Sequence, residues 1–154
     1  MRNELTDGNP DDTLLIYVGR LCATKLLPQL KHTLEKLPNV RLAFVGRGPS
    51  EAMLKEHFAG TKTKFMGVMH GERLSQAFAS ADLFVMPSDS ETLGFVVIES
   101  MASGVPVVGA NAGGIPSIIK DGKTGLLVTP RDPEEFTAKV QSMLEDRQKL
   151  AEFA

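Results

Sequence analysis

Short apolar runs alternate with amphipathic segments along almost the whole of this 154-residue chain, and this alternation limits the folds that it can adopt. The run at 14–18 is continuously apolar and is followed by Gly19, as expected of a strand that is buried on both faces. The segment 26–36 then spaces its leucines three to four residues apart, which predicts one buried face of a helix that stops at Pro38.

The same pattern recurs through the rest of the chain. We predict further strands at 40–45, 62–66, 82–86, 105–109 and 125–128, and further helices at 52–58, 73–80, 95–102, 115–119 and 134–144. Six strands that alternate with helices predict an α/β fold with a doubly wound, Rossmann-like parallel sheet. Ligands of such sheets bind outside the carboxyl ends of the strands, so the residues that follow each strand are the candidates for a site.

Composition and charge exclude several classes of protein. The hydrophobic content of 42% is that of a soluble fold, and a net charge of −2 argues against a general nucleic-acid binder. The long uncharged segment 104–119 is broken by Gly, Pro, Ser and Asn, so it predicts no membrane-spanning helix. The single cysteine, Cys22, excludes an internal disulfide and a cysteine-rich zinc site, and we expect it to be buried or half-buried.

The length of the chain suits one compact domain, which we expect at 14–154 after a lead-in at 1–13. The lead-in has no apolar stretch for a secretory signal, and its acidic residues argue against a transit peptide. Asn, Pro and Asp residues between positions 7 and 12 favour a turn at the surface, as at the end of a connection between domains.

Two cations, Arg20 and Lys25, follow Gly19 at the end of the first predicted strand. They lie on either side of the start of the next helix, where an arginine fork, a lysine charge and free backbone N–H groups could hold a diphosphate. The alternative is that both are solvated surface cations.

Two glycines, Gly46 and Gly48, follow the second predicted strand. They would let the backbone approach either a ligand or a neighbouring loop. A dinucleotide-binding fingerprint would need a third glycine where the chain has Glu51, so a nicotinamide dehydrogenase is disfavoured.

Two glutamates, Glu91 and Glu99, follow the fourth predicted strand. The rise of a helix would place them about 10 Å apart, which matches opposite parts of one nucleotide sugar. Glu91 could then accept hydrogen bonds from the sugar and Glu99 from the ribose. Between them, the free N–H groups of Thr92, Leu93 and Gly94 could seat a phosphate. Alternatively, Glu91 is a first-turn acid favoured by the helix dipole and Glu99 an exposed helix residue.

A larger set of motifs surrounds these glutamates. It comprises Gly94-Phe95, the run Ala102-Ser103-Gly104-Val105-Pro106-Val107, the run Gly113-Gly114-Ile115-Pro116, and Gly122 with Gly125-Leu126-Leu127. In this order the motifs resemble the donor-binding domain of retaining GT-B glycosyltransferases of family 4. The resemblance extends from about residue 14 to residue 144. Segments 5–10, 14–20, 41–49, 74–80, 84–86 and 90–93 are most similar to sulfoquinovosyltransferases, which make sulfolipid from UDP-sulfoquinovose and diacylglycerol.

The resemblance implies a role for each residue that matches a family motif. Arg20 and Lys25 would neutralise the donor diphosphate and leaving group, and Glu91 would contact the transferred sugar, so these three are the expected catalytic residues. Glu99 would hold the ribose. The expected donor-binding residues are Gly19, Gly67, Val68, Met69, Thr92, Leu93, Gly94 and Glu99, of which 67–69 belong to the loop that seats the base. His70 is expected to be a loop or surface residue rather than a general base.

The chain also departs from the family pattern at three positions. Cys22 stands near the place of a usual glycine and Thr24 at that of a glutamate, which changes the expected shape of the loop more than its charge. Ser117 replaces the acid that often follows the Gly-Gly-Ile-Pro motif, which weakens a donor or interdomain contact there.

A GT-B enzyme consists of two Rossmann-like domains with the active site between them. The resemblance therefore implies that this chain is the carboxyl-terminal half, ending before the last GT-B helix and inactive alone. Its lead-in would come from a missing amino-terminal acceptor domain. The implied reaction is retaining transfer of a hexosyl group from a nucleotide sugar, UDP-sulfoquinovose, to a lipid, diacylglycerol.

No cofactor is expected, and since the chain has no Asp-x-Asp motif, we expect metal-independent transfer. The expected location is the cytoplasm or a plastid, at the periphery of a membrane. The alternatives are a family member that uses GDP-mannose or UDP-glucose, a non-catalytic module that binds a nucleotide sugar, and a sugar-nucleotide epimerase.

Overall fold

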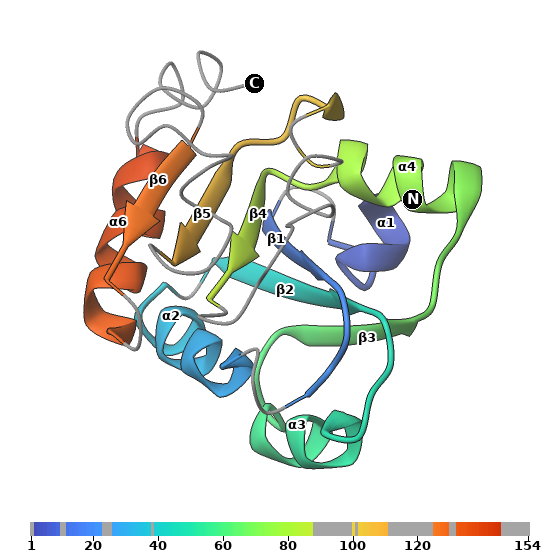
Figure 1. Cartoon of the computed structure of the whole chain (residues 1–154), viewed down its shortest axis with the longest axis horizontal. Coiled ribbons are helices and arrows are strands. Elements are labelled where there is room, and N and C mark those ends of the chain that lie inside the picture. Colours follow the sequence, from blue (N-terminus) through green and yellow to red (C-terminus); the bar gives the residue numbers. More distant parts are fainter. Residues whose placement is uncertain are drawn as a thin grey trace.

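Among the residues that the structure describes, six parallel strands form one sheet (Figure 1). The computed structural model describes residues 2–9, 12–22, 26–37, 39–87, 100, 102–110, 125–129 and 132–145. The strands are β1 (Thr13–Val18), β2 (Val40–Val45), β3 (Thr63–Gly67), β4 (Leu83–Met86), β5 (Val107–Ala110) and β6 (Gly125–Val128). Their spatial order is β3-β2-β1-β4-β5-β6, and every neighbouring pair is parallel. The predicted doubly wound sheet is confirmed.

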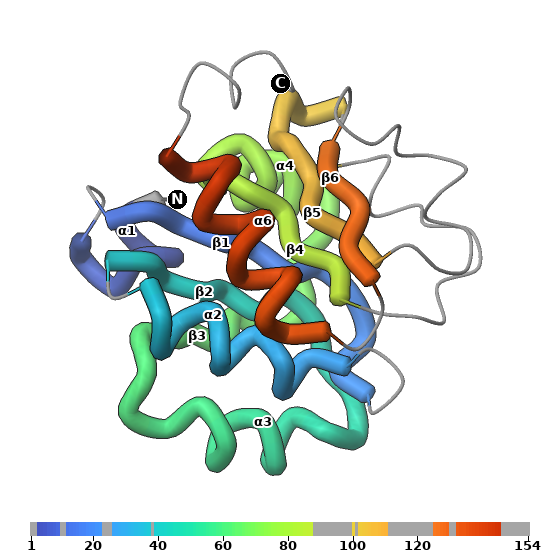
Figure 2. The backbone as a smooth tube through the Cα atoms, turned by 90° about the vertical axis from the view of Figure 1, so that its left-hand side faces the viewer, coloured from blue at the N-terminus to red at the C-terminus, as the bar shows by residue number. Residues whose placement is uncertain are grey.

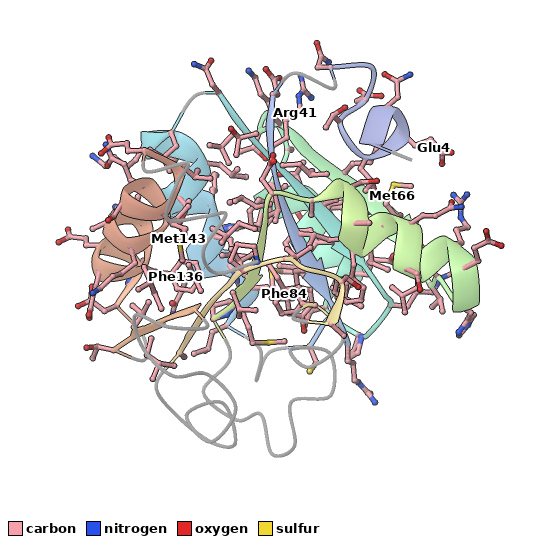
Figure 3. All side chains as sticks on the ribbon, turned by 90° about the horizontal axis from the view of Figure 1, so that it is seen from above. Glu4, Arg41, Met66, Phe84, Phe136 and Met143 are labelled. Atoms are coloured by element: carbon pink, nitrogen blue, oxygen red, sulfur yellow. The ribbon has the colours of Figure 1, made fainter. Side chains whose placement is uncertain are left out.

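Helices cover both faces of this sheet. They are α1 (Arg2–Leu5), α2 (Leu30–Lys36) with the preceding 3-10 turn η2 (Leu27–Gln29), α3 (Glu51–His57), α4 (Gly71–Ser80) and α6 (Pro133–Glu145). Figure 2 shows α2 and α6 side by side on one face. Helices α1 and α4 pack together on the opposite face, as the view from above shows (Figure 3).

Buried apolar side chains fill the space between the layers. Phe84 lies near the middle of the molecule, and Phe136 and Met143 lie on the side of α6 that faces the sheet (Figure 3). The ring of Phe44 meets that of Tyr17 edge-on at 6.0 Å between centroids and stacks on Phe65 at 5.0 Å. Burial on both faces fixes β1 and β2, and with them the loops at their carboxyl ends.

The structure explains the later start of two predicted elements. The helix predicted at 26–36 starts with the 3-10 turn η2, because Leu26 has a left-handed conformation (φ 55°) and Pro28 has no N–H to donate. The strand predicted at 105–109 starts at Val107, because the Val105 N–H turns back to the Ser100 carbonyl oxygen at 3.0 Å. The helix predicted at 115–119 and most of that at 95–102 lie outside the described residues.

The pattern also gave no sign of α1. Its last residue, Leu5, is only 1% exposed and joins the main hydrophobic core. The lead-in at 1–13 therefore contributes to the packing of the sheet on the face that carries α4.

Candidate functional site

A cleft of about 250 Å³ opens where β1, β2 and β3 end. It is lined by the last residues of two strands and by the loops that follow three of them: Val18, Gly19, Arg20, Val45, Gly46, Arg47, Val68 and Met69. Strand β1 has β2 on one side and β4 on the other, so the direction in which successive strands are added to the sheet reverses at β1. The cleft adjoins this point. Ligands of doubly wound sheets bind at this point.

Backbone hydrogen bonds hold two walls of the cleft together beyond the ends of the strands. The Gly19 N–H donates to the Val45 carbonyl oxygen at 3.0 Å, and the Leu21 N–H donates to that of Arg47 at 3.1 Å. The Ser50 N–H then donates to the Leu21 carbonyl oxygen at 2.9 Å. The loops after β1 and β2 are therefore a paired extension of the sheet, and the side chains of Arg20 and Arg47 start from fixed backbone positions.

Glycines make this pairing of loops possible. Gly46 has a φ of 135°, and a Cβ atom there would overlap the Gly19 carbonyl oxygen. A Cβ atom at Gly48 would likewise overlap the Leu21 carbonyl oxygen. Of the two roles that the sequence left open for Gly46 and Gly48, the structure shows close approach to the neighbouring loop.

The buried side chain of Tyr17 supports the first loop from below. Its hydroxyl group donates a hydrogen bond to the Arg20 carbonyl oxygen at 2.9 Å. A Cβ atom at Gly19 would lie 2.9 Å from the same hydroxyl oxygen, so a larger residue there would displace this support. Tyr17 therefore fixes the backbone from which the Arg20 side chain projects.

The charge of the cleft is positive. Arg20 and Arg47 both line it, both side chains are exposed, and the described lining residues include no acidic one. Within the described part of the chain, the ion pairs that the structure shows involve other residues. Two exposed guanidinium groups in a cleft with glycines in its lining suit an anionic ligand.

The third wall of the cleft is mainly apolar. Gly67 ends β3 with a φ of 72°, and its carbonyl oxygen accepts a hydrogen bond from the Gly46 N–H at 2.8 Å. The next residue, Val68, is 51% exposed, whereas Met69 is buried and His70 is exposed. The cleft thus combines cationic groups on two walls with an exposed apolar side chain on the third.

This arrangement brings together four of the predicted site residues, which come from two distant segments: Gly19, Arg20, Val68 and Met69. A fifth, Gly67, lies beside the cleft, beneath the side chain of Arg47. The other predicted residues, Lys25, Glu91, Thr92, Leu93, Gly94 and Glu99, lie outside the described residues, and their roles stay predictions. Cys22 is half-buried, as the sequence predicted.

Arg47 is the lining residue for which the sequence suggested no role. A signal was present, because a Gly-Arg pair follows each of the first two strands, Gly19-Arg20 after β1 and Gly46-Arg47 after β2. The parallel arrangement of β1 and β2 places both pairs at the same edge of the sheet. Arg47 therefore has the same place after its strand as Arg20 has after β1.

Charges at the opposite, amino edge of the sheet are arranged differently. There the Arg41 Nε donates to the Asp12 carboxylate at 2.7 Å, and the Lys64 ammonium lies 3.7 Å from the carboxylate of Asp7. The hydrogen bond from Arg41 holds the pKa of Asp12 below its usual value, and the positive charge of Lys62 acts in the same direction. Partial burial opposes this shift of the pKa but does not cancel it.

In the described ranges, His, Cys, Asp and Glu side chains form no group of three that could hold a metal ion. None of the helices described here is long and apolar enough to cross a membrane.

The fold and the cleft define a Rossmann-like α/β domain with a cationic cleft at the carboxyl edge of its sheet. Residues 6–154 match the family Glycosyl transferases group 1. The chain belongs to this family, which confirms the resemblance that its motifs carry.

Relatives of known sequence are named as sugar transferases. The chain is 50% identical over 151 residues to sulfoquinovosyl transferase SQD2 of Arabidopsis thaliana, across 96% of this chain and 30% of that protein. It is 35% identical over 144 residues to a D-inositol 3-phosphate glycosyltransferase of Mycobacteroides abscessus, across 87% of this chain and 32% of that protein. The chain thus spans about a third of the length of these relatives.

Solved structures agree with the fold. Alr3699/HepE of Anabaena in complex with UDP-glucose superposes with a TM-score of 0.89 at 26% identity, over 99% of this chain and 44% of that chain. Sucrose-phosphate synthase of Thermosynechococcus elongatus gives 0.85 at 29% identity, over 94% and 39% of the two chains. The sheet described here therefore corresponds to a Rossmann-like domain of GT-B glycosyltransferases.

Proposed function

We propose that this chain binds the nucleotide-sugar donor of a retaining glycosyltransferase, and that its cleft holds the nucleoside diphosphate. The observation that carries the proposal is the cleft itself, into which Arg20 and Arg47 bring exposed guanidinium groups and whose described lining residues include no carboxylate. A diphosphate matches the charge of Arg20, which offers it paired N–H donors.

The relatives support a uridine nucleotide as the donor. A sulfoquinovosyl transferase shares half of its aligned residues with this chain, and Alr3699/HepE binds UDP-glucose. We therefore infer that the donor is UDP-sulfoquinovose. The acceptor is diacylglycerol, which a separate amino-terminal domain would hold at a membrane surface in the cytoplasm or a plastid.

In this reaction the bond between the anomeric carbon and the diphosphate breaks, and the acceptor oxygen bonds to the same face of the sugar. The departing diphosphate helps to accept the acceptor proton. Arg20 and Lys25 stabilise the negative charge that develops on the leaving group, and Glu91 and Glu99 hold the sugar and the ribose. Arg20 and Lys25 supply positive charge opposite the diphosphate and the chain has no Asp-x-Asp motif, so the transfer is proposed to need no metal ion and no cofactor.

Calorimetric titration of the chain with UDP, GDP and UDP-glucose tests this proposal. UDP and UDP-glucose are expected to bind. Arg20→Ala should weaken binding about 10- to 100-fold, as loss of a charge-assisted hydrogen bond predicts. Glu99→Ala should also weaken it, through the ribose. Arg73→Ala is the matched control, because Arg73 is an exposed arginine that pairs with Glu4 at 3.0 Å.

Three results would count against the proposal. A preference for GDP would overturn the uridine assignment and favour a mannosyltransferase. Equal binding by wild type and Arg20→Ala would remove the diphosphate from this cleft. Failure of the folded chain to bind any of the three nucleotides would contradict its role as a donor-binding module.

A further inference from the structure

Arg47 enters the cleft beside the loop that follows β3. It follows Gly46 at the end of β2, and its carbonyl oxygen is held by the Leu21 N–H. Its side chain extends toward β3, because the guanidinium Nη2 and Nε atoms lie 3.6 and 3.7 Å from the position that a Cβ atom of Gly67 would take. The absence of a side chain at Gly67 leaves room for the guanidinium group against the backbone of this loop.

The surroundings of Arg47 are more apolar than a diphosphate site requires. Val68 and Met69 line the same part of the cleft, and Val68 exposes 51% of its surface. An exposed apolar side chain next to a planar cation favours a ligand group that is itself flat, with apolar faces and a polar rim. A nucleobase has this character, whereas a phosphate group is compact and strongly hydrated.

We propose that Arg47 is a specificity-determining residue that contacts the nucleobase of the donor, its guanidinium plane stacked on the base that lies against Val68. Arg20 then serves the diphosphate, so the two arginines divide the nucleotide between them. This inference rests on the proposed function. It assigns a role to the side chain that follows β2, which neither the motifs nor the comparisons single out.

The chemistry of the two basic residues makes the assignment testable. Arginine stacks on aromatic planes through a delocalised guanidinium group, whereas the lysine ammonium is a compact, hydrated point charge. A contact with the base therefore depends on the plane of residue 47, and a contact with phosphate depends mainly on its charge. Binding of pyrophosphate measures the phosphate contact alone, because pyrophosphate lacks the base and the ribose.

The experiment compares the dissociation constants of UDP and inorganic pyrophosphate for wild type, Arg47→Ala, Arg47→Lys and Arg20→Ala. Arg47→Ala should weaken UDP about 5- to 30-fold, the range expected for stacking on a base, and change pyrophosphate by less than about threefold. Arg47→Lys should behave like Arg47→Ala. Arg20→Ala should weaken both ligands. Lys36→Ala removes an exposed cation of α2 far from the cleft lining and is the charge-matched control.

The outcomes separate this inference from the proposed function. If wild type binds UDP and Arg47→Ala binds it equally well, the inference is overturned while the proposed function stands. If Arg47→Ala weakens UDP and pyrophosphate alike and Arg47→Lys restores both, Arg47 is a phosphate contact and the inference is again overturned. If the folded wild-type chain binds no UDP, both fail. Urea unfolding of each variant checks its fold, and no large change is expected because the Arg47 side chain is exposed.

Discussion

The two edges of the sheet use the same kinds of charged residue in opposite ways. At the amino edge, Arg41 and Lys64 each lie next to a carboxylate of the same chain. At the carboxyl edge, Arg20 and Arg47 line a cleft whose described lining residues include no acidic one. The charges at the first edge are balanced within the domain, whereas we propose that those at the second bind a ligand.

This difference separates stability from function along the same strands. Arg41 lies near the start of β2 and Arg47 just after its end, so one strand places an ion-paired arginine at one edge of the sheet and, as we propose, a ligand-binding arginine at the other. Substitutions at the amino edge should therefore change the free energy of unfolding, and those of exposed side chains at the carboxyl edge should change ligand affinity.

The largest expected effect comes from the glycine that joins the two loops of the cleft. Gly46→Ala should lower the free energy of unfolding by about 2–5 kcal/mol, since its Cβ atom would overlap a backbone oxygen and its φ is positive. Gly60→Ala is the control, because φ is also positive there (84°) but no atom lies within 4 Å of the added carbon. It should cost about 1 kcal/mol. Urea unfolding measures both, and equal losses would show that the loops tolerate separation.

The next largest effect is expected from Arg20 at the carboxyl edge. Arg20→Ala should change the free energy of unfolding by less than about 0.5 kcal/mol, because its side chain is exposed and the Tyr17 hydrogen bond uses only its backbone. UDP affinity should nevertheless fall at least about tenfold. Thermal unfolding of this variant with and without saturating UDP measures both quantities. A large loss of stability without ligand would make Arg20 a structural residue and erase the contrast between the edges.

Arg41→Met should give the reverse result at the amino edge. Loss of the pair with Asp12 is expected to lower the free energy of unfolding only slightly, because solvent screens much of the attraction. UDP affinity should stay the same within about twofold, since Arg41 does not line the cleft. Urea unfolding and titration with UDP measure the two quantities. Weakened UDP binding would show that the two edges are coupled.

The smallest effect concerns pH. The pKa of Asp12 is lowered in the folded chain, so its contribution to stability is present above the unfolded pKa of about 3.9 and is lost as pH falls through the folded value. Asp12→Asn should therefore lose less stability than wild type between about pH 6 and pH 3. Urea midpoints at these two pH values test this, and equal losses in both proteins would place the acid sensitivity elsewhere.

Much of this architecture could be predicted because β1 and β2 are buried on both faces and leave continuous apolar runs in the sequence. The strands predicted at 40–45 and 125–128 coincide with β2 and β6. Arg20 could be predicted as a site residue because it directly follows a strand and a glycine. The local sequence pattern was sufficient to predict these strands and this position.

The remainder depends on contacts between distant segments. The direction of the Arg47 side chain follows from the pairing of the loops after β1 and β2 and from the open space at Gly67, neither of which is visible as a periodicity. The 3-10 start of the helix after β1 likewise depends on the left-handed conformation of Leu26, and the core role of Leu5 on packing against the α4 side of the sheet.

We infer that a nucleotide binds at the carboxyl edge of the sheet, and amide chemical shifts would report on this binding. Addition of UDP to the ¹⁵N-labelled chain should shift the amide signals of Gly19, Gly46 and Gly67, which lie in or beside the cleft. The signals of Gly8 and Gly60, which lie away from it, should stay in place. Shifts confined to Gly8 and Gly60, or no shifts at saturating UDP, would show that the nucleotide does not bind at this edge.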